Sequence, residues 1–170
     1  MDLHPDVRRL LGSWRLERFR IHYDDGAQQH PMGEDADGLI VYTEAGYMSG
    51  QLMQRGRPRF AAVRSSVAER AIGTPEEIVA AFNGYFAYFC RFRVDTAQRR
   101  VEHDVLCCHL PDWEGRRLER FYSFEDAGAH ERLVLRSAPI TIEGRGARNE
   151  LMFRREPASA PASLLANPLS

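Results

Sequence analysis

Lysine is absent from this sequence of 170 residues, so all 23 basic residues are arginines. A chain without lysine cannot form a Schiff base, cannot attach pyridoxal phosphate, and lacks the lysine of a phosphate-binding loop. Its net charge is also small, −1 at pH 7. No broad electrostatic field therefore attracts the chain to nucleic acid or to an anionic membrane, and neither is expected as a partner.

Cysteine is scarce as well, with only Cys90, Cys107 and Cys108. An odd number of cysteines at this spacing does not indicate a disulfide framework. No apolar run approaches the ~20 residues that would span a bilayer, and the first twenty residues carry charges throughout instead of an export signal. We expect a soluble, reduced, cytoplasmic protein whose oligomeric state the sequence does not determine.

Between residues 12 and 155 the dominant hydrophobic period is two, which is typical of β-strands. Aromatic and β-branched residues are concentrated in segments separated by Gly, Pro or Asp. At ~150 residues per domain the chain forms one domain, which we place at residues 1–155, followed by a disordered Pro/Ala/Ser tail at 156–170. The predicted strands lie near 12–22, 38–43, 47–54, 85–95, 100–108, 116–124, 131–137 and 148–155.

One segment departs from this period. Thr74-Pro75-Glu76-Glu77 combines a capping hydroxyl, a proline at the first helical position and a glutamate at the third. This pattern predicts one short helix near 75–83. Its apolar residues Ile78, Val79 and Phe82 share a face, so we expect that face to pack against the mouth or edge of the strands.

Many short antiparallel strands in one domain favour an all-β fold, and closure into a barrel removes exposed strand edges. Trp14 opens the first strand, and Arg154-Arg155 ends the last. A guanidinium can stack over the indole where these strands meet. We therefore predict a closed antiparallel barrel of about 8–10 strands with that contact at one end.

Several short fragments stand in a characteristic order and spacing: Gly12-x-Trp14-x-Leu16, Gly38 to Thr43, Gly46 to Ser49, Gln51 to Met53, Gly84 to Phe89, His103, Pro111-x-Trp113-x-Gly115, Arg120 and Leu151-x-Phe153-x-Arg155. Together they resemble the bacterial and fungal lipocalin-like domain family from about residue 10 to 155. Cys90 stands where the family pattern has Gly, and Phe153 stands where it has Trp. The resemblance implies a small barrel with an interior pocket for an apolar or amphipathic molecule, and some similar proteins are thought to be cyclases or isomerases.

Alternation assigns one face of each strand to the interior. Glu102, Asp104, Glu119 and Glu150 fall on the opposite faces, so no carboxylate is expected inside. In the 38–54 hairpin we take the more apolar set as inward, although a pocket could recruit Gln51 and one bulge at Gly46 would reverse the choice. The inward residues are Ile40, Tyr42, Met48 and Leu52; Phe86, Tyr88, Cys90, Phe92 and Val94; Val101, His103, Val105 and Cys107; Leu118, Arg120, Tyr122 and Phe124.

His103 and Arg120 are the informative members of this set. Counting from the centre of the loop at 109–115 places them nearly opposite each other on neighbouring strands, where Cβ atoms lie ~5 Å apart. A buried guanidinium needs a carboxylate, several carbonyls or an anionic ligand. One interpretation is a ligand with a carboxylate, enolate or phenolate, and the other is an internal network of Arg120 with tyrosine hydroxyls and backbone carbonyls.

These residues support two functions in the same pocket. The first is binding of an apolar or amphipathic small molecule with an anionic or carbonyl group. The second is a cofactor-independent cyclase or isomerase acting on a polyketide- or terpenoid-like intermediate, with His103, Arg120 and Tyr88 as catalytic groups. A barrel filled by side chains remains the structural alternative. The predicted ligand contacts are Tyr42, Met48, Phe86, Tyr88, Cys90, Phe92, His103, Val105, Arg120 and Tyr122.

Other chemistries fit the sequence poorly. His103 and Cys107 would lie ~13 Å apart along a strand, so they cannot share a zinc ion. Ser49 lacks the strand-to-helix turn of a hydrolase serine, and Cys90 is more typical of an inert core thiol than of a nucleophile. Neither paired inward carboxylates nor a Gly-rich dinucleotide fingerprint is present. We expect neither a cofactor nor a metal.

Overall fold

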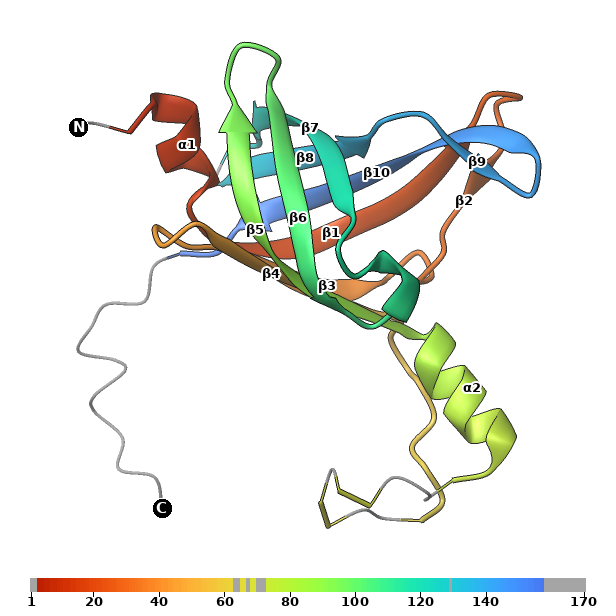
Figure 1. Cartoon of the computed structure of the whole chain (residues 1–170). Coiled ribbons are helices and arrows are strands. Elements are labelled where there is room, and N and C mark those ends of the chain that lie inside the picture. Colours follow the sequence, from red (N-terminus) through yellow and green to blue (C-terminus); the bar gives the residue numbers. More distant parts are fainter. Residues whose placement is uncertain (1–2, 63–64, 67, 70–72, 129, 158–170) are drawn as a thin grey trace.

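The computed structural model describes residues 3–62, 65–66, 68–69, 73–128 and 130–157. Its ten strands form one antiparallel sheet, which closes because β1 pairs with β10 as well as with β3. Eight of these strands make a barrel, as predicted, and β2 and β9 extend it at the rim (Figure 1). The strands are β1 (Gly12–Tyr23), β2 (Gln28–Gln29), β3 (Asp37–Tyr42), β4 (Tyr47–Met53), β5 (Tyr85–Asp95), β6 (Arg100–Cys108), β7 (Arg117–Asp126), β8 (Glu131–Ser137), β9 (Ile140–Ile142) and β10 (Arg145–Arg155).

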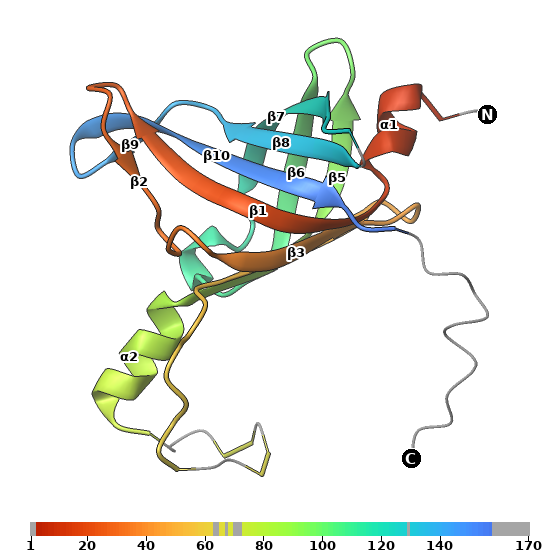
Figure 2. The same ribbon diagram turned by 180° about the vertical axis from the view of Figure 1, so that it is seen from behind.

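The first and last strands meet where the sequence predicts. Figure 2 shows β1 lying beside β10 along most of its length, and Trp14 is directly paired with Arg155. The Arg155 guanidinium lies 4.0 Å from the centre of the Trp14 ring. This confirms the cation–π contact, which closes one end of the barrel.

A short helix that the periodicity did not indicate covers this closed end. The helix α1 (Pro5–Leu10) has proline in its first turn, and its Leu10 side chain is fully buried. Trp14 Nε1 donates a 2.8 Å hydrogen bond to the Leu10 carbonyl. Six residues are too few for a helical period to be read from the sequence.

The predicted helix, α2 (Pro75–Asn83), forms with its capping box intact. The Thr74 hydroxyl accepts from the Glu77 amide, and the Glu77 carboxylate accepts from the Thr74 amide. The packing prediction was wrong for most of the apolar face, because Ile78 and Val79 are 42% and 57% exposed. Figure 1 shows α2 projecting away from the end of the barrel opposite α1.

Alternation correctly assigned the inward face of most strands, but it failed at the end of β6. The pairing of β5 with β6 shifts at Phe89 and Cys90, which face Cys107 and Val105, so that Leu106 is an extra residue. One bulged residue reverses the alternation beyond it. Cys107, predicted to point inward, is therefore exposed, and Cys108 is only partly buried.

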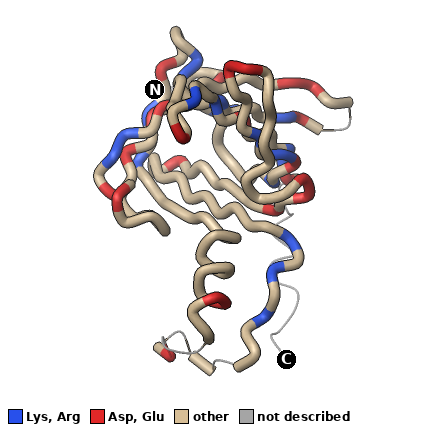
Figure 3. The backbone as a smooth tube through the Cα atoms, turned by 90° about the vertical axis from the view of Figure 1, so that its right-hand side faces the viewer, with Lys and Arg blue, Asp and Glu red and all other residues tan. Residues whose placement is uncertain are grey.

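The predicted outward carboxylates form ion pairs on the outer wall. Arg100 contacts Glu102 at 3.2 Å and Glu119 at 2.7 Å, while Arg136 contacts Glu150 at 2.8 Å. Figure 3 shows charges of both signs interspersed around the barrel.

The predicted tail lies largely outside the described residues, which end at position 157. No helix in the described ranges is both long enough and apolar enough to cross a membrane.

Candidate functional site

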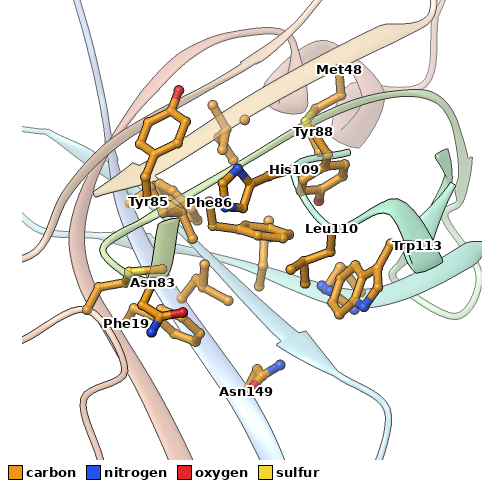
Figure 4. A pocket seen from close by; sticks show the side chains of 18 of the residues that line it. Phe19, Met48, Asn83, Tyr85, Phe86, Tyr88, His109, Leu110, Trp113 and Asn149 are labelled. Carbon is orange, nitrogen blue, oxygen red and sulfur yellow. The ribbon is translucent and has the colours of Figure 1, made fainter. Parts of the chain in front are cut away.

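A cavity of about 290 Å³ occupies the half of the barrel nearest α2. Figure 4 shows side chains from β1, β4, β5, β10 and the β6–β7 connection pointing toward it. Most of the wall is apolar. The lining residues are Phe19, Met32, Ile40, Met48, Gly50, Leu52, Phe82, Asn83, Tyr85, Phe86, Tyr88, His109, Leu110, Trp113, Arg120, Leu135, Asn149, Leu151 and Phe153.

Part of the cavity wall is formed by the end of α2 and by the connection between β6 and β7. The ring of His109 lies 4.0 Å from that of Phe82, and its Nε2 lies 3.1 Å from the Phe82 carbonyl. A short 3₁₀ helix, η1 (Pro111–Trp113), brings the Trp113 ring edge-on to Phe86, 5.5 Å between centres. The aromatic rim thus joins elements that are far apart in sequence.

Arg120 is the arginine of this cavity. It lies on β7, paired with Val101 of β6, and its Nη1 donates a 2.9 Å hydrogen bond to the carbonyl of Glu119. No aspartate or glutamate occurs among the described lining residues. The other guanidinium donors therefore lack a carboxylate partner on the cavity wall, which leaves them available to an acceptor on a ligand.

His103 lies behind Tyr88 and is fully buried. Its Nε2 is 2.9 Å from the Tyr42 hydroxyl, and its Nδ1 is 3.0 Å from the Tyr88 hydroxyl. Burial, with a smaller contribution from the positive charge of Arg120, lowers the pKa of His103 to about 3. The imidazole is therefore neutral near pH 7, with both nitrogens already hydrogen bonded.

The prediction that His103 and Arg120 lie nearly opposite each other was wrong by two residues. His103 pairs with Leu118, whereas Arg120 pairs with Val101. The pairing of β6 with β7 already ends at Val105 and Arg116. The centre of the connection therefore lies earlier than the centre of 109–115, and counting from that loop centre gave a register two residues away. The two side chains keep the same face, and the electrostatic effect of Arg120 reaches His103.

Of the ten predicted ligand contacts, Met48, Phe86, Tyr88 and Arg120 line this cavity. The Tyr122 hydroxyl instead bonds Asp6 of α1 at 3.0 Å, near the closed end. The period of two distinguishes inside from outside but does not give depth along the barrel. The predicted contacts that lie outside the lining are Tyr42, Cys90, Phe92, His103, Val105 and Tyr122.

Cys90 belongs to the core. It is fully buried, and burial raises the pKa of its thiol to about 12. A thiol in that state is a poor nucleophile at neutral pH.

Sequence reasoning missed several lining residues because it did not assign the inward faces of three strands. Asn149, Leu151 and Phe153 alternate on β10, and the same count applied to that strand would have found them. Trp113 and His109 lie in the β6–β7 connection, whose side-chain directions follow no simple period.

Two comparisons with known proteins agree with this geometry. The model of the lipocalin-like domain family matches residues 11–156. A protein of Aspergillus oryzae named 4′-hydroxy-3′-methoxypropiophenone carrier protein is 32% identical over 117 residues, which cover 65% of this chain and 97% of that relative.

Proposed function

The chain belongs to the lipocalin-like domain family, and from this premise we propose that it binds an apolar or amphipathic small molecule with a carbonyl or anionic group inside the barrel. The observation that carries the proposal is the apolar cavity with Arg120 and without a described carboxylate on its wall. An apolar wall with a few polar groups is typical of small-molecule binding sites.

The dimensions of the cavity limit the ligand. About 290 Å³ is close to the lower end of the range for ligand sites, roughly 300–1,000 Å³. A single substituted aromatic ring suits this space better than a polycyclic skeleton. The name of the Aspergillus oryzae relative refers to a phenolic aryl ketone, which combines one ring with a carbonyl, and we propose the same class of compound here.

Binding fits the geometry better than catalysis by His103. Its imidazole does not line the cavity, and tyrosine hydroxyls lie at both of its nitrogens. With a pKa of about 3 it is also a weak base near pH 7, far from the value that suits proton transfer. We therefore propose a carrier function, with a cyclase or isomerase as the alternative outcome of the test below.

The test is a fluorescence titration with 4′-hydroxy-3′-methoxypropiophenone. The chain has two tryptophans; Trp113 lines the cavity, whereas Trp14 is buried at the closed end. We expect saturable quenching that Trp113→Phe removes, together with a higher melting temperature when ligand is present. Chromatography should recover the compound unchanged, and a new product would instead support the enzyme.

A pair of leucine variants locates the binding. Leu151→Phe adds volume inside the cavity and should weaken binding at least tenfold, because the close-packed barrel wall cannot shift outward to make room for the larger side chain. Leu106→Phe makes the same change at a side chain that is 50% exposed on the outer wall and should bind like wild type. Equal affinity in all three proteins would contradict an interior site.

A further inference from the structure

Three side chains from three strands form a hydrogen-bonded chain that ends in the cavity. Tyr42 of β3 contacts His103 of β6 through Nε2, and Tyr88 of β5 contacts it through Nδ1. Tyr42 is 1% exposed and His103 is fully buried, whereas Tyr88 lines the cavity. These two hydrogen bonds therefore connect the buried core, at Tyr42, with the cavity, at Tyr88.

The burial of Tyr42 determines which imidazole nitrogen carries the proton. A neutral imidazole has one N–H donor and one acceptor nitrogen. Within the described residues, the hydroxyl of Tyr42 has His103 Nε2 as its hydrogen-bond partner and no other. If Nε2 carried the proton, the Tyr42 O–H would be left without an acceptor in the core, which folded proteins avoid. Tyr42 thus donates to Nε2, and Nδ1 carries the proton.

This tautomer sets the direction of the Tyr88 hydroxyl. The Nδ1–H of His103 donates to Tyr88 Oη, so the hydroxyl hydrogen of Tyr88 must point away from the imidazole. The described part of the chain offers Tyr88 no second hydrogen-bond partner. Figure 4 shows Tyr88 among the side chains that surround the cavity, with Leu110 and Trp113 nearby. An acceptor on a molecule in the cavity, which Tyr88 lines, would satisfy this O–H.

Arg120 supplies further donors on the same wall. Both residues line the cavity, and the positive charge of Arg120 acts on the hydroxyl of Tyr88, partly opposing the increase in pKa that burial causes. An arginine has only donors, and of these one is directed to the Glu119 carbonyl. A fixed phenol donor and a guanidinium therefore act in one small space.

We propose that the cavity selects ligands presenting a hydrogen-bond acceptor oxygen, such as a ketone carbonyl, to Tyr88 and Arg120. In this proposal Tyr88 contacts the ligand, while Tyr42 and His103 are positioning residues that hold its hydroxyl as a donor. The inference rests on the proposed binding function and adds what the site recognises.

The tautomer can be measured without a ligand. In the full chain labelled with ¹⁵N-histidine, the signals of His103 are identified by their loss in His103→Gln. We expect a protonated, pyrrole-like Nδ1 and an unprotonated, pyridine-like Nε2 near pH 7. The reverse assignment would overturn the inference, because Tyr88 would then donate to the imidazole.

Selectivity is tested with two compounds that differ only at the carbonyl: 4′-hydroxy-3′-methoxypropiophenone and the analogue whose side chain is propyl. Tyr88→Phe should weaken binding of the ketone about tenfold, as expected for one lost hydrogen bond. Binding of the propyl analogue should change less than twofold. Equal effects on both compounds would contradict the inference.

The positioning role needs a variant that leaves the cavity wall intact. Tyr42→Phe removes the donor to Nε2 outside the lining and should weaken ketone binding about threefold relative to the propyl analogue, because the Tyr88 hydroxyl is no longer fixed. Tyr122→Phe is the matched control, since this tyrosine bonds Asp6 instead, and it should keep the wild-type ratio. A Tyr42→Phe ratio equal to that of wild type would remove Tyr42 and His103 from the explanation.

The failure of the inference can be distinguished from that of the proposed function. If Tyr88→Phe binds both compounds as wild type does, the carrier function stands and the acceptor selectivity is wrong. If neither compound binds wild type, the binding function is wrong for this ligand class and the selectivity falls with it, whatever the tautomer.

Discussion

At the scale of single residues, His103 makes stability depend on pH. Unfolded histidine takes up a proton near pH 6.5, whereas the folded protein resists protonation of His103 until about pH 3. Between these values protons favour the unfolded chain, so stability falls as the pH falls. We expect the free energy of unfolding to decrease between pH 7 and pH 5 by about 2 kcal/mol more in wild type than in His103→Gln, measured by urea denaturation.

His22→Gln is the matched control for this measurement. The His22 side chain is 38% exposed, near Glu150 on the outer wall, so its removal should leave the steep dependence of the wild type. Parallel pH dependences for wild type and His103→Gln would show that the buried imidazole is protonated about as readily as in the unfolded chain.

The sequence correctly predicts whether a side chain points into the barrel, but not where along the barrel it lies. The alternation around His103 and Arg120 correctly pointed both side chains inward, because a period of two is fixed by strand geometry. Their position along the barrel depends on how many residues the β6–β7 connection consumes. The pairing of β6 with β7 already ends at Val105 and Arg116, and no local pattern in the sequence marks that point.

At the scale of elements, α2 depends on its own capping more than on packing. Its body projects from the barrel with Ile78 and Val79 exposed, so apolar packing stabilises most of the helix little. Glu77→Ala removes the acceptor for the amides of Thr74 and Ala61 and should accelerate hydrogen exchange of the α2 amides several-fold, while the global melting temperature stays the same. Hydrogen exchange followed by mass spectrometry compares the α2 amides of wild type and variant, and thermal denaturation gives the melting temperature.

Glu76→Ala provides the control, because it removes the same charge from the same helical turn but leaves the hydrogen bonds between Thr74 and Glu77 intact. Its α2 amides should exchange more slowly than those of Glu77→Ala. Equal acceleration would attribute the effect to charge at the helix start instead of the capping box.

The sequence predicts that α2 forms, but not whether its apolar face is covered. Thr74, Pro75 and Glu77 form a local signal, and such signals survive in any tertiary context. Whether an apolar face is covered depends on distant elements, and here only the end of α2 reaches the cavity, through Phe82 and Asn83.

At the scale of the whole molecule, the closure of the barrel was predictable because the two residues that meet there lie at the ends of the strand pattern. Trp14 and Arg155 are the start and finish of that pattern, and their pairing requires a closed sheet. The volume left inside was not predictable, since it depends on how side chains from all strands fill the interior.

Arg155 holds this closed end together and offers the test of the whole barrel. It stacks on Trp14, donates through Nε to Glu131 at 2.8 Å and through Nη1 to the Leu11 carbonyl at 3.0 Å, and contacts the carbonyl of Arg9. Arg155→Ala leaves the two carbonyls without this donor, leaves Glu131 with Arg9 as its partner, and exposes the indole, so we expect a loss of about 3 kcal/mol in the free energy of unfolding.

The neighbouring Arg154 allows the same substitution without these contacts, since its side chain is 46% exposed and pairs with Glu156. Arg154→Ala should change stability by less than about 0.5 kcal/mol, as is usual for surface ion pairs. Urea denaturation of both variants measures the difference. Similar losses would mean that strand pairing alone closes the barrel. A selective loss in Arg155→Ala would show that the stacked guanidinium, which ties α1, β1, β8 and β10 together, is required for full stability.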